Sequence, residues 1–136
     1  MVELARSIAD ELEIRDVVLA ISLEADTGHL DDYGALYSDD AVVVSPSGTN
    51  EGKVAIIAAN SARRSTGIMG PGTGARHHVV PGLVVVDGDL ATVRSLFAFY
   101  VRVDGAPQLA RIGEYQDELR REGTRWKMVR RTCTFD

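Results

Sequence analysis

Hydrophobic positions in the first part of the chain repeat with the spacing of an α-helix. Between residues 4 and 26 apolar side chains recur mostly every three or four positions, and Glu and Arg fill the gaps. This pattern predicts a long amphipathic helix. Gly28 follows it, and glycine commonly ends a helix. The apolar positions are Leu4, Ile8, Leu12, Val18, Ile21 and Ala25.

The next segment alternates between short helical and strand patterns. Asp31 and Asp32 are acidic residues of the kind favoured in a first helical turn, so a second helix is predicted over 31–37. A turn is predicted at residues 39–40. The β-branched run 41–44 then predicts a strand, and residues 45–48 a loop.

A third helix is predicted over residues 53–65, with Val54, Ile57 and Ala58 on its apolar side. The glycine-rich segment 66–74 follows. It lacks the strand–loop–helix setting and the lysine of a phosphate-binding loop. We therefore interpret it as a flexible connection or a lid.

From residue 75 onward the pattern is that of β-strands joined by tight turns. Asp-Gly pairs at 87–88 and 104–105 and a Glu-Gly pair at 122–123 are typical of hairpins. Three successive hairpins give a four-stranded antiparallel meander, so helices and sheet together predict an α+β domain. The predicted strands are residues 79–86, 89–103, 109–120 and 126–135.

The strand around residues 91–101 has two different faces. One row is nearly all apolar and is expected to face the helices. Its members are Ala91, Val93, Ser95, Phe97, Phe99 and Val101. The opposite row still carries Leu96, Ala98 and Tyr100, which favours a subunit interface on the outer face.

Composition and charge narrow the classes of partner. The chain has 136 residues, of which 45% are hydrophobic and 26% charged, as expected of one globular domain over residues 1–136. A net charge of −5 argues against nucleic acid and anionic membranes as main partners. No apolar run approaches a membrane span, and no signal peptide is visible, so a cytoplasmic location is expected.

The sequence offers no metal or nucleotide motif. Its single cysteine, Cys133, is interpreted as a small buried hydrophobic residue. The three histidines have no metal-ligand spacing. We therefore expect no metal and no cofactor.

Asp26 and His77 are the candidates for chemistry. Asp26 ends the first predicted helix, where the negative end of the helix dipole disfavours a carboxylate. His77 begins a strand, and a carboxylate paired with an imidazole makes an acid–base dyad. The alternatives are an Asp26 that caps turn amides and a His77 exposed beside His78. His29 lies in a turn and is expected to be solvated.

Several segments together resemble the SnoaL-like branch of the nuclear transport factor 2-like superfamily. That branch includes scytalone dehydratase, bile-acid dehydratases, polyketide cyclases and the small subunits of ring-hydroxylating dioxygenases. The resemblance implies a cystatin-like α+β cone, with N-terminal helices packed on a curved antiparallel sheet. The matching segments, in the family's order, are residues 14–16, 25–31, 36–42, Gly52 with Ile56, 76–77, 113–119 and 126–128.

The resemblance also implies roles for individual residues. In the dehydratase branch the positions of Asp26 and His77 hold a pair that removes a proton next to a carbonyl. Scytalone dehydratase has tyrosines that position a water on the carbonyl, where this chain has Ala25 and Ser45. It has a second cavity histidine, where this chain has Ser95.

Four further residues are candidates for contact with a small apolar ligand. Ser95 is either a filler or a ligand-contacting hydroxyl, and Phe97 is core or pocket wall. Tyr115 either reaches a substrate oxygen or is a core tyrosine. Arg131 either binds an anion or carbonyl at the open end of the cone or lies at the surface or an interface.

Two functions from different classes follow. One is a cofactor-independent lyase or isomerase, dehydratase- or cyclase-like, acting on a small apolar carbonyl compound such as a polyketide or steroid. The other is a non-catalytic binding or assembly subunit of the same fold. Epoxide hydrolase chemistry on the same fold fits less well, because the Asp-Arg-Asp set that it typically needs cannot be assembled here. Ketosteroid isomerase chemistry also fits less well, because the placement of residues here does not match its tyrosine and protonated acid. A homo-oligomer, dimer or trimer, is expected.

Overall fold

The computed structural model describes all residues from 1 to 136 and contains three helices and one six-stranded sheet. The strand order is β2-β1-β6-β5-β4-β3, and every pair is antiparallel except the parallel pair β1–β6. The elements are α1 (Val2–Thr27), α2 (Leu30–Gly34), β1 (Tyr37–Ser45), β2 (Gly48–Glu51), α3 (Lys53–Ser65), β3 (Arg76–Asp87), β4 (Leu90–Val103), β5 (Ala106–Glu122) and β6 (Arg125–Phe135).

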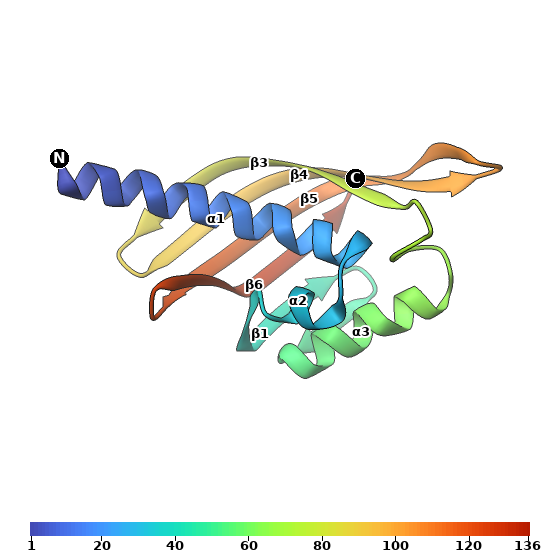
Figure 1. The fold of residues 1–136 in the computed structure, drawn as a ribbon, viewed down its shortest axis with the longest axis horizontal. Helices are drawn as coiled ribbons and strands as arrows, with labels where there is room; N and C mark the ends of the chain where they lie inside the picture. Colours follow the sequence, from blue (N-terminus) through green and yellow to red (C-terminus); the bar gives the residue numbers. More distant parts are fainter.

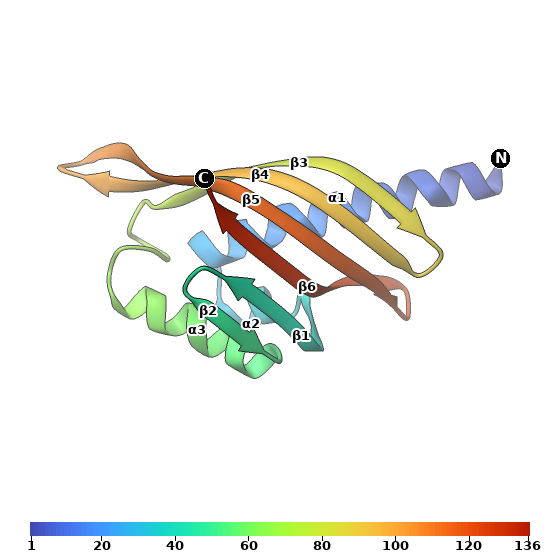
Figure 2. The same ribbon diagram turned by 180° about the vertical axis from the view of Figure 1, so that it is seen from behind.

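The three helices cover one face of the curved sheet. α1 runs along β3–β6, while α2 and α3 lie near β1 and β2 (Figure 1). The opposite face carries no helix (Figure 2). This arrangement confirms the expected cystatin-like α+β cone and its four-stranded meander β3–β6. None of the helices has both the length and the apolar character that crossing a membrane requires.

The core lies between α1 and the concave face of the sheet. Ile14, Val18 and Ile21 of α1 are buried there with Leu119 and Trp126 of the sheet. Along β4 burial alternates as predicted, and the expected inner row is buried or half-buried. Burial of such side chains is the main favourable contribution to the fold.

The first turns of α1 pack differently from the prediction. Leu4, Ile8 and Leu12 are exposed, whereas Asp10 is buried. Asp10 points inward because Oδ1 accepts a hydrogen bond from Trp126 Nε1 at 3.2 Å and Oδ2 one from Arg121 Nη2 at 2.6 Å. The predicted apolar face was therefore wrong for this half of the helix.

The segment after α2 also differs from the prediction. α2 ends at Gly34, and β1 begins at Tyr37, so residues 39–40 lie inside a strand and do not form a turn. The pairing of β1 with β6 is irregular between Tyr37 and Val42, and Asp39 and Asp40 in this stretch are exposed. Their carboxylates pair with Lys53 and Arg120.

Two further predictions near α3 needed correction. Residues 48–51, beginning at the end of the predicted loop, form strand β2, which pairs antiparallel with β1. On α3, Val54 is 83% exposed, while Ile56 and Asn60 are buried. The predicted apolar side of α3 was therefore wrong, because the helix turns Asn60 rather than Val54 toward the interior.

Candidate functional site

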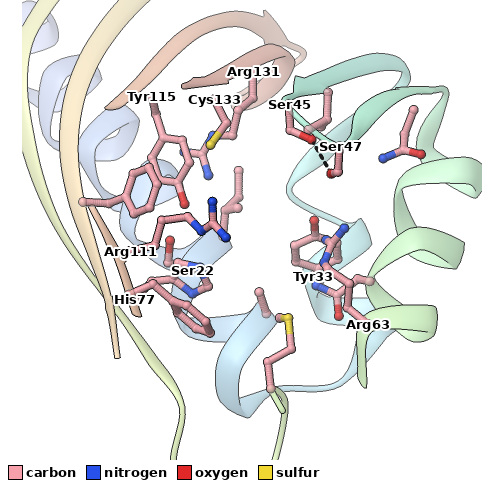
Figure 3. Close-up of a pocket in the computed structure, with 18 of the residues that line it drawn as sticks. Ser22, Tyr33, Ser45, Ser47, Arg63, His77, Arg111, Tyr115, Arg131 and Cys133 are labelled. Carbon is pink, nitrogen blue, oxygen red and sulfur yellow. Dashed lines mark hydrogen bonds between the residues drawn. The ribbon is translucent and has the colours of Figure 1, made fainter. Parts of the chain in front are cut away.

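A cavity of about 250 Å³ lies between the concave sheet face and the helices. Its sheet side is formed largely by aromatic rings, and α1 and α3 supply the opposite side (Figure 3). Met69 of the glycine-rich segment is buried and also lines it. The apolar wall comprises Ile21, Ala25, Val43, Met69, Phe97, Phe99, Cys133 and Phe135.

His77 lines this cavity, and Asp26 lies directly behind it. Asp26 is 1% exposed, and its Oδ1 lies 2.8 Å from His77 Nδ1. Its Oδ2 accepts a hydrogen bond from the backbone N–H of His77 at 2.6 Å. An ionised carboxylate only accepts hydrogen bonds, so this geometry assigns the proton of neutral His77 to Nδ1. Nε2 then carries the free lone pair.

The neighbouring chain supports a carboxylate at the end of α1. Arg64 of α3 donates from Nη2 to the carbonyl oxygens of Glu24 and Ala25, at 2.9 and 3.1 Å. This places a positive charge at the negative end of the α1 dipole. Together with the two hydrogen bonds from His77, it offsets the unfavourable position of Asp26.

Packing fixes the orientation of the His77 ring. The ring stacks on Phe99 with centroids 4.3 Å apart, and it lines the cavity. His78 is exposed on the outer face, and His29 is exposed in the turn before α2. The alternation at the start of β3 therefore turns only the first histidine of the pair inward.

Arg131 is buried and forms an ion pair with Asp117. Its Nε and Nη2 donate to the two carboxylate oxygens at 2.8 and 2.9 Å, and its guanidinium lies 3.9 Å from the centroid of the Tyr115 ring. Burial alone would lower the pKa of Arg131, but the attraction of Asp117 raises it above its ordinary value. Burial raises the pKa of Tyr115. The surface alternative for Arg131 was wrong.

The remaining predicted positions divide into two groups. Phe97, Tyr115 and Arg131 line the cavity, whereas Ser95 is buried outside the lining and its Oγ has no hydrogen-bond partner. Cys133 is half-buried in the wall, and burial raises the pKa of its thiol. Ala25 and Ser45, which replace the tyrosines of scytalone dehydratase, also line the cavity.

No group of three or more His, Cys, Asp or Glu side chains is arranged to hold a metal ion.

Sequence reasoning missed several polar lining residues. Tyr33 and Tyr37 pair through their hydroxyls at 3.2 Å, and both line the cavity. Asn60 and Arg63 line it from α3, one helical turn apart. Arg111 lines it from β5, and its place on the strand face of Tyr115 was the signal available in the sequence.

The profile of the SnoaL-like domain matches residues 6–132, nearly the whole chain. The chain belongs to the SnoaL-like domain family. No curated protein sequence is significantly similar to it.

Solved structures of SnoaL-like and related folds superpose on most of the chain. A nuclear transport factor 2-like protein with a cystatin-like fold from Novosphingobium aromaticivorans is 26% identical with a TM-score of 0.90, over 98% of this chain and 86% of that one. A candidate scytalone dehydratase from the same organism is 21% identical with a TM-score of 0.79, over 96% of this chain and 86% of that one. The β subunit of a candidate aromatic-ring-hydroxylating dioxygenase, also from that organism, is 20% identical with a TM-score of 0.77, over 97% of this chain and 92% of that one.

The last two similarities establish the fold and do not by themselves separate an enzyme from an assembly subunit.

Proposed function

We propose that this SnoaL-like protein is a cofactor-independent lyase or isomerase that removes a proton next to a carbonyl group of a small, largely apolar compound. The observation that supports the proposal is the pair Asp26–His77. Its carboxylate is buried and bound to Nδ1, and its imidazole faces a cavity with an aromatic wall. A base of this kind, held in one tautomer, meets the geometric requirement for proton abstraction.

In the proposed reaction His77 Nε2 takes the proton, and the electrons of the C–H bond move into the carbonyl to form an enolate. Asp26 stabilises the imidazolium that forms. In a dehydration, the enolate then expels a β-hydroxyl group, to which Nε2–H returns the proton, so that water leaves. In an isomerisation, Nε2–H returns the proton to another carbon. Hydrogen-bond donors in the cavity, Tyr115 among them, contact the carbonyl oxygen.

The size of the cavity limits the substrate. A volume of about 250 Å³ lies just below the range of about 300–1,000 Å³ typical of ligand pockets. This favours a compound with one or two rings, such as a small polyketide, over a four-ring steroid. The aromatic wall of Phe97 and Phe99 suits a flat ring system.

Paired histidine variants test the proposal. We expect His77→Asn to lower turnover of an enone or β-hydroxy carbonyl substrate by about 10²–10⁴-fold, because asparagine keeps a donor near Asp26 but provides no base. His78→Asn is the matched control, since His78 is the adjacent, exposed histidine. Equal turnover of wild type and His77→Asn, with circular dichroism showing both folded, would exclude the proposal.

A second candidate is a non-catalytic binding or assembly subunit. The observation that favours it is the apolar outer sheet face, where Val80, Val85 and Leu96 are 66%, 60% and 57% exposed. The same face supports a homo-oligomer, dimer or trimer. Ligand binding without turnover of any carbonyl compound, together with a stable assembly in light scattering, would favour this reading over catalysis.

A further inference from the structure

The cavity collects positive charge in a protein whose net charge is negative. The chain carries a net charge of −5, yet none of the residues lining the cavity is Asp or Glu. Three arginines and one histidine line it. They are Arg63, Arg111, Arg131 and His77.

Two of these four side chains already have carboxylate partners, and two do not. Asp117 neutralises Arg131, and Asp26 binds His77. The guanidinium groups of Arg63 and Arg111 make no hydrogen bond and no ion pair with the protein.

Arg111 is nevertheless held in position. Its guanidinium lies 3.9 Å from the centroid of the Phe135 ring, which orients the cation without supplying a negative charge. Figure 3 shows Arg111 on the sheet side of the cavity and Arg63 on the α3 side. The two free cations therefore flank the cavity from opposite walls.

Asn60 provides an independent indication of a ligand that accepts hydrogen bonds. The side chain is fully buried and lines the cavity, and its Nδ2 has no partner. Its Oδ1 accepts a hydrogen bond from Arg64 Nε at 2.9 Å, which fixes the orientation of the amide and leaves Nδ2 as the free donor. A buried donor without a partner carries a desolvation cost that a ligand oxygen would remove.

Asn60 and Arg63 stand one turn apart on the same face of α3, one buried and the other exposed. Deep in the cavity there is thus an unpaired amide donor, and nearer the solvent there are unpaired cations. A ligand that satisfies both has an apolar body with an acceptor oxygen inside and an anionic group outside.

We propose that the ligand of this cavity is the anion of a small aromatic or alicyclic carboxylic acid. Its carboxylate binds between Arg63 and Arg111, its ring packs on the phenylalanine wall, and an acceptor oxygen of its body receives the Asn60 amide. This inference rests on the proposed function for the site and adds the charge of the substrate to it. Guanidinium groups suit a carboxylate because they donate two parallel hydrogen bonds.

The test compares 2-naphthoate with its neutral methyl ester, which has nearly the same ring and shape. Two-dimensional ¹H–¹⁵N spectra of the arginine Nε–H groups, assigned with Arg63→Gln and Arg111→Gln, report contact directly. We expect millimolar 2-naphthoate to move the Arg63 and Arg111 signals and the ester to leave them in place. The double variant should bind 2-naphthoate roughly tenfold or more weakly.

Arg130→Gln is the matched control, because it removes the same charge from an exposed position outside the cavity lining. It should leave the affinity for 2-naphthoate unchanged. Any of three results would overturn the inference. The Arg63 and Arg111 signals could stay in place with 2-naphthoate, they could shift equally with acid and ester, or Arg130→Gln could lose as much affinity as the double variant.

The outcome is separable from that of the proposed catalysis. If the ester binds as well as the acid while His77→Asn loses turnover, the proposal of an anionic ligand is wrong and the proposal that His77 is the base is supported. If 2-naphthoate binds at Arg63 and Arg111 while His77→Asn keeps full turnover, the proposal of an anionic ligand is supported and the proposal that His77 is the base is wrong.

Discussion

Asp26 binds both the ring and the backbone of His77, with Oδ1 2.8 Å from Nδ1 and Oδ2 2.6 Å from the backbone nitrogen. The two contacts fix the start of β3 against the end of α1. They also fix the ring in the tautomer that leaves Nε2 free. Positioning of a strand and preparation of a base therefore depend on the same carboxylate.

Replacing Asp26 by Asn should disturb the His77 tautomer. The two hydrogen bonds from His77 use different carboxylate oxygens. An amide has an NH₂ donor in place of one of them, so one of the two bonds is lost. We expect ¹⁵N spectra of the wild type to show His77 protonated at Nδ1 when neutral, and spectra of Asp26→Asn to show a mixture of tautomers. His78 should be unchanged and serves as the internal control. A His77 spectrum identical in both proteins would contradict this assignment.

Removing one partner of the buried pair Arg131–Asp117 should destabilise the fold strongly, whereas replacing both partners by apolar residues should destabilise it little. We expect Asp117→Asn to lower the free energy of unfolding by about 3–5 kcal/mol, because it leaves a buried cation without its partner. The double replacement Asp117→Leu/Arg131→Met should recover most of that loss. Urea denaturation measures both.

The exposed pair Arg94–Glu114 provides the comparison for that prediction. Glu114→Gln should have little measurable effect, since surface ion pairs contribute little. A loss in Asp117→Asn no larger than that in Glu114→Gln would show that the buried pair is not a structural requirement.

Asp10 should contribute to the loss of stability in acid. Hydrogen bonds from Arg121 and Trp126 hold the pKa of Asp10 below its ordinary value. Its stabilising effect is therefore complete above the ordinary aspartate pKa and is lost as pH falls through the lowered one. The difference in unfolding free energy between wild type and Asp10→Asn should shrink from about pH 6 to about pH 2. A constant difference for Asp10→Asn over this pH range would refute the linkage.

Cys133 should report on access to the cavity. Burial raises the pKa of its thiol, so less thiolate is present at neutral pH than in a free cysteine. We expect iodoacetamide to alkylate Cys133 more slowly than it alkylates glutathione, and we expect the rate to keep increasing at pH values where the rate of glutathione has levelled off. Because Cys133 lines the cavity, a bound ligand such as 2-naphthoate should slow the reaction further. A rate equal to that of glutathione and insensitive to ligand would place the thiol outside the wall.

The long helix, the meander and the inward row of β4 were predictable because each has a strong period and clear turn residues. Strand β2 was missed because its sequence Gly-Thr-Asn-Glu shows no apolar alternation. The strand at Asp39 and Asp40 was mistaken for a turn because two consecutive aspartates are typical of turns. In the structure they lie where the pairing of β1 with β6 is irregular. Tertiary pairing, which the local sequence does not encode, decided both cases.

For the site, the sequence indicated Asp26, His77, Phe97 and Tyr115 through the family resemblance and the strand alternation. It did not indicate Asn60, because the predicted apolar side of α3 pointed elsewhere. The inward turn of Asn60 depends on contacts with Arg64 and the cavity, which only the assembled fold supplies.

The parallel pairing of β1 with β6 joins the first strand of the chain to the last. β1 and β2, which line one side of the cavity, join the rest of the sheet through this pairing, so that side cannot be completed before β6 has been made. Contacts this distant in sequence form late and slow the folding reaction. During synthesis on the ribosome, the ligand site should therefore be among the last parts of the molecule to assemble.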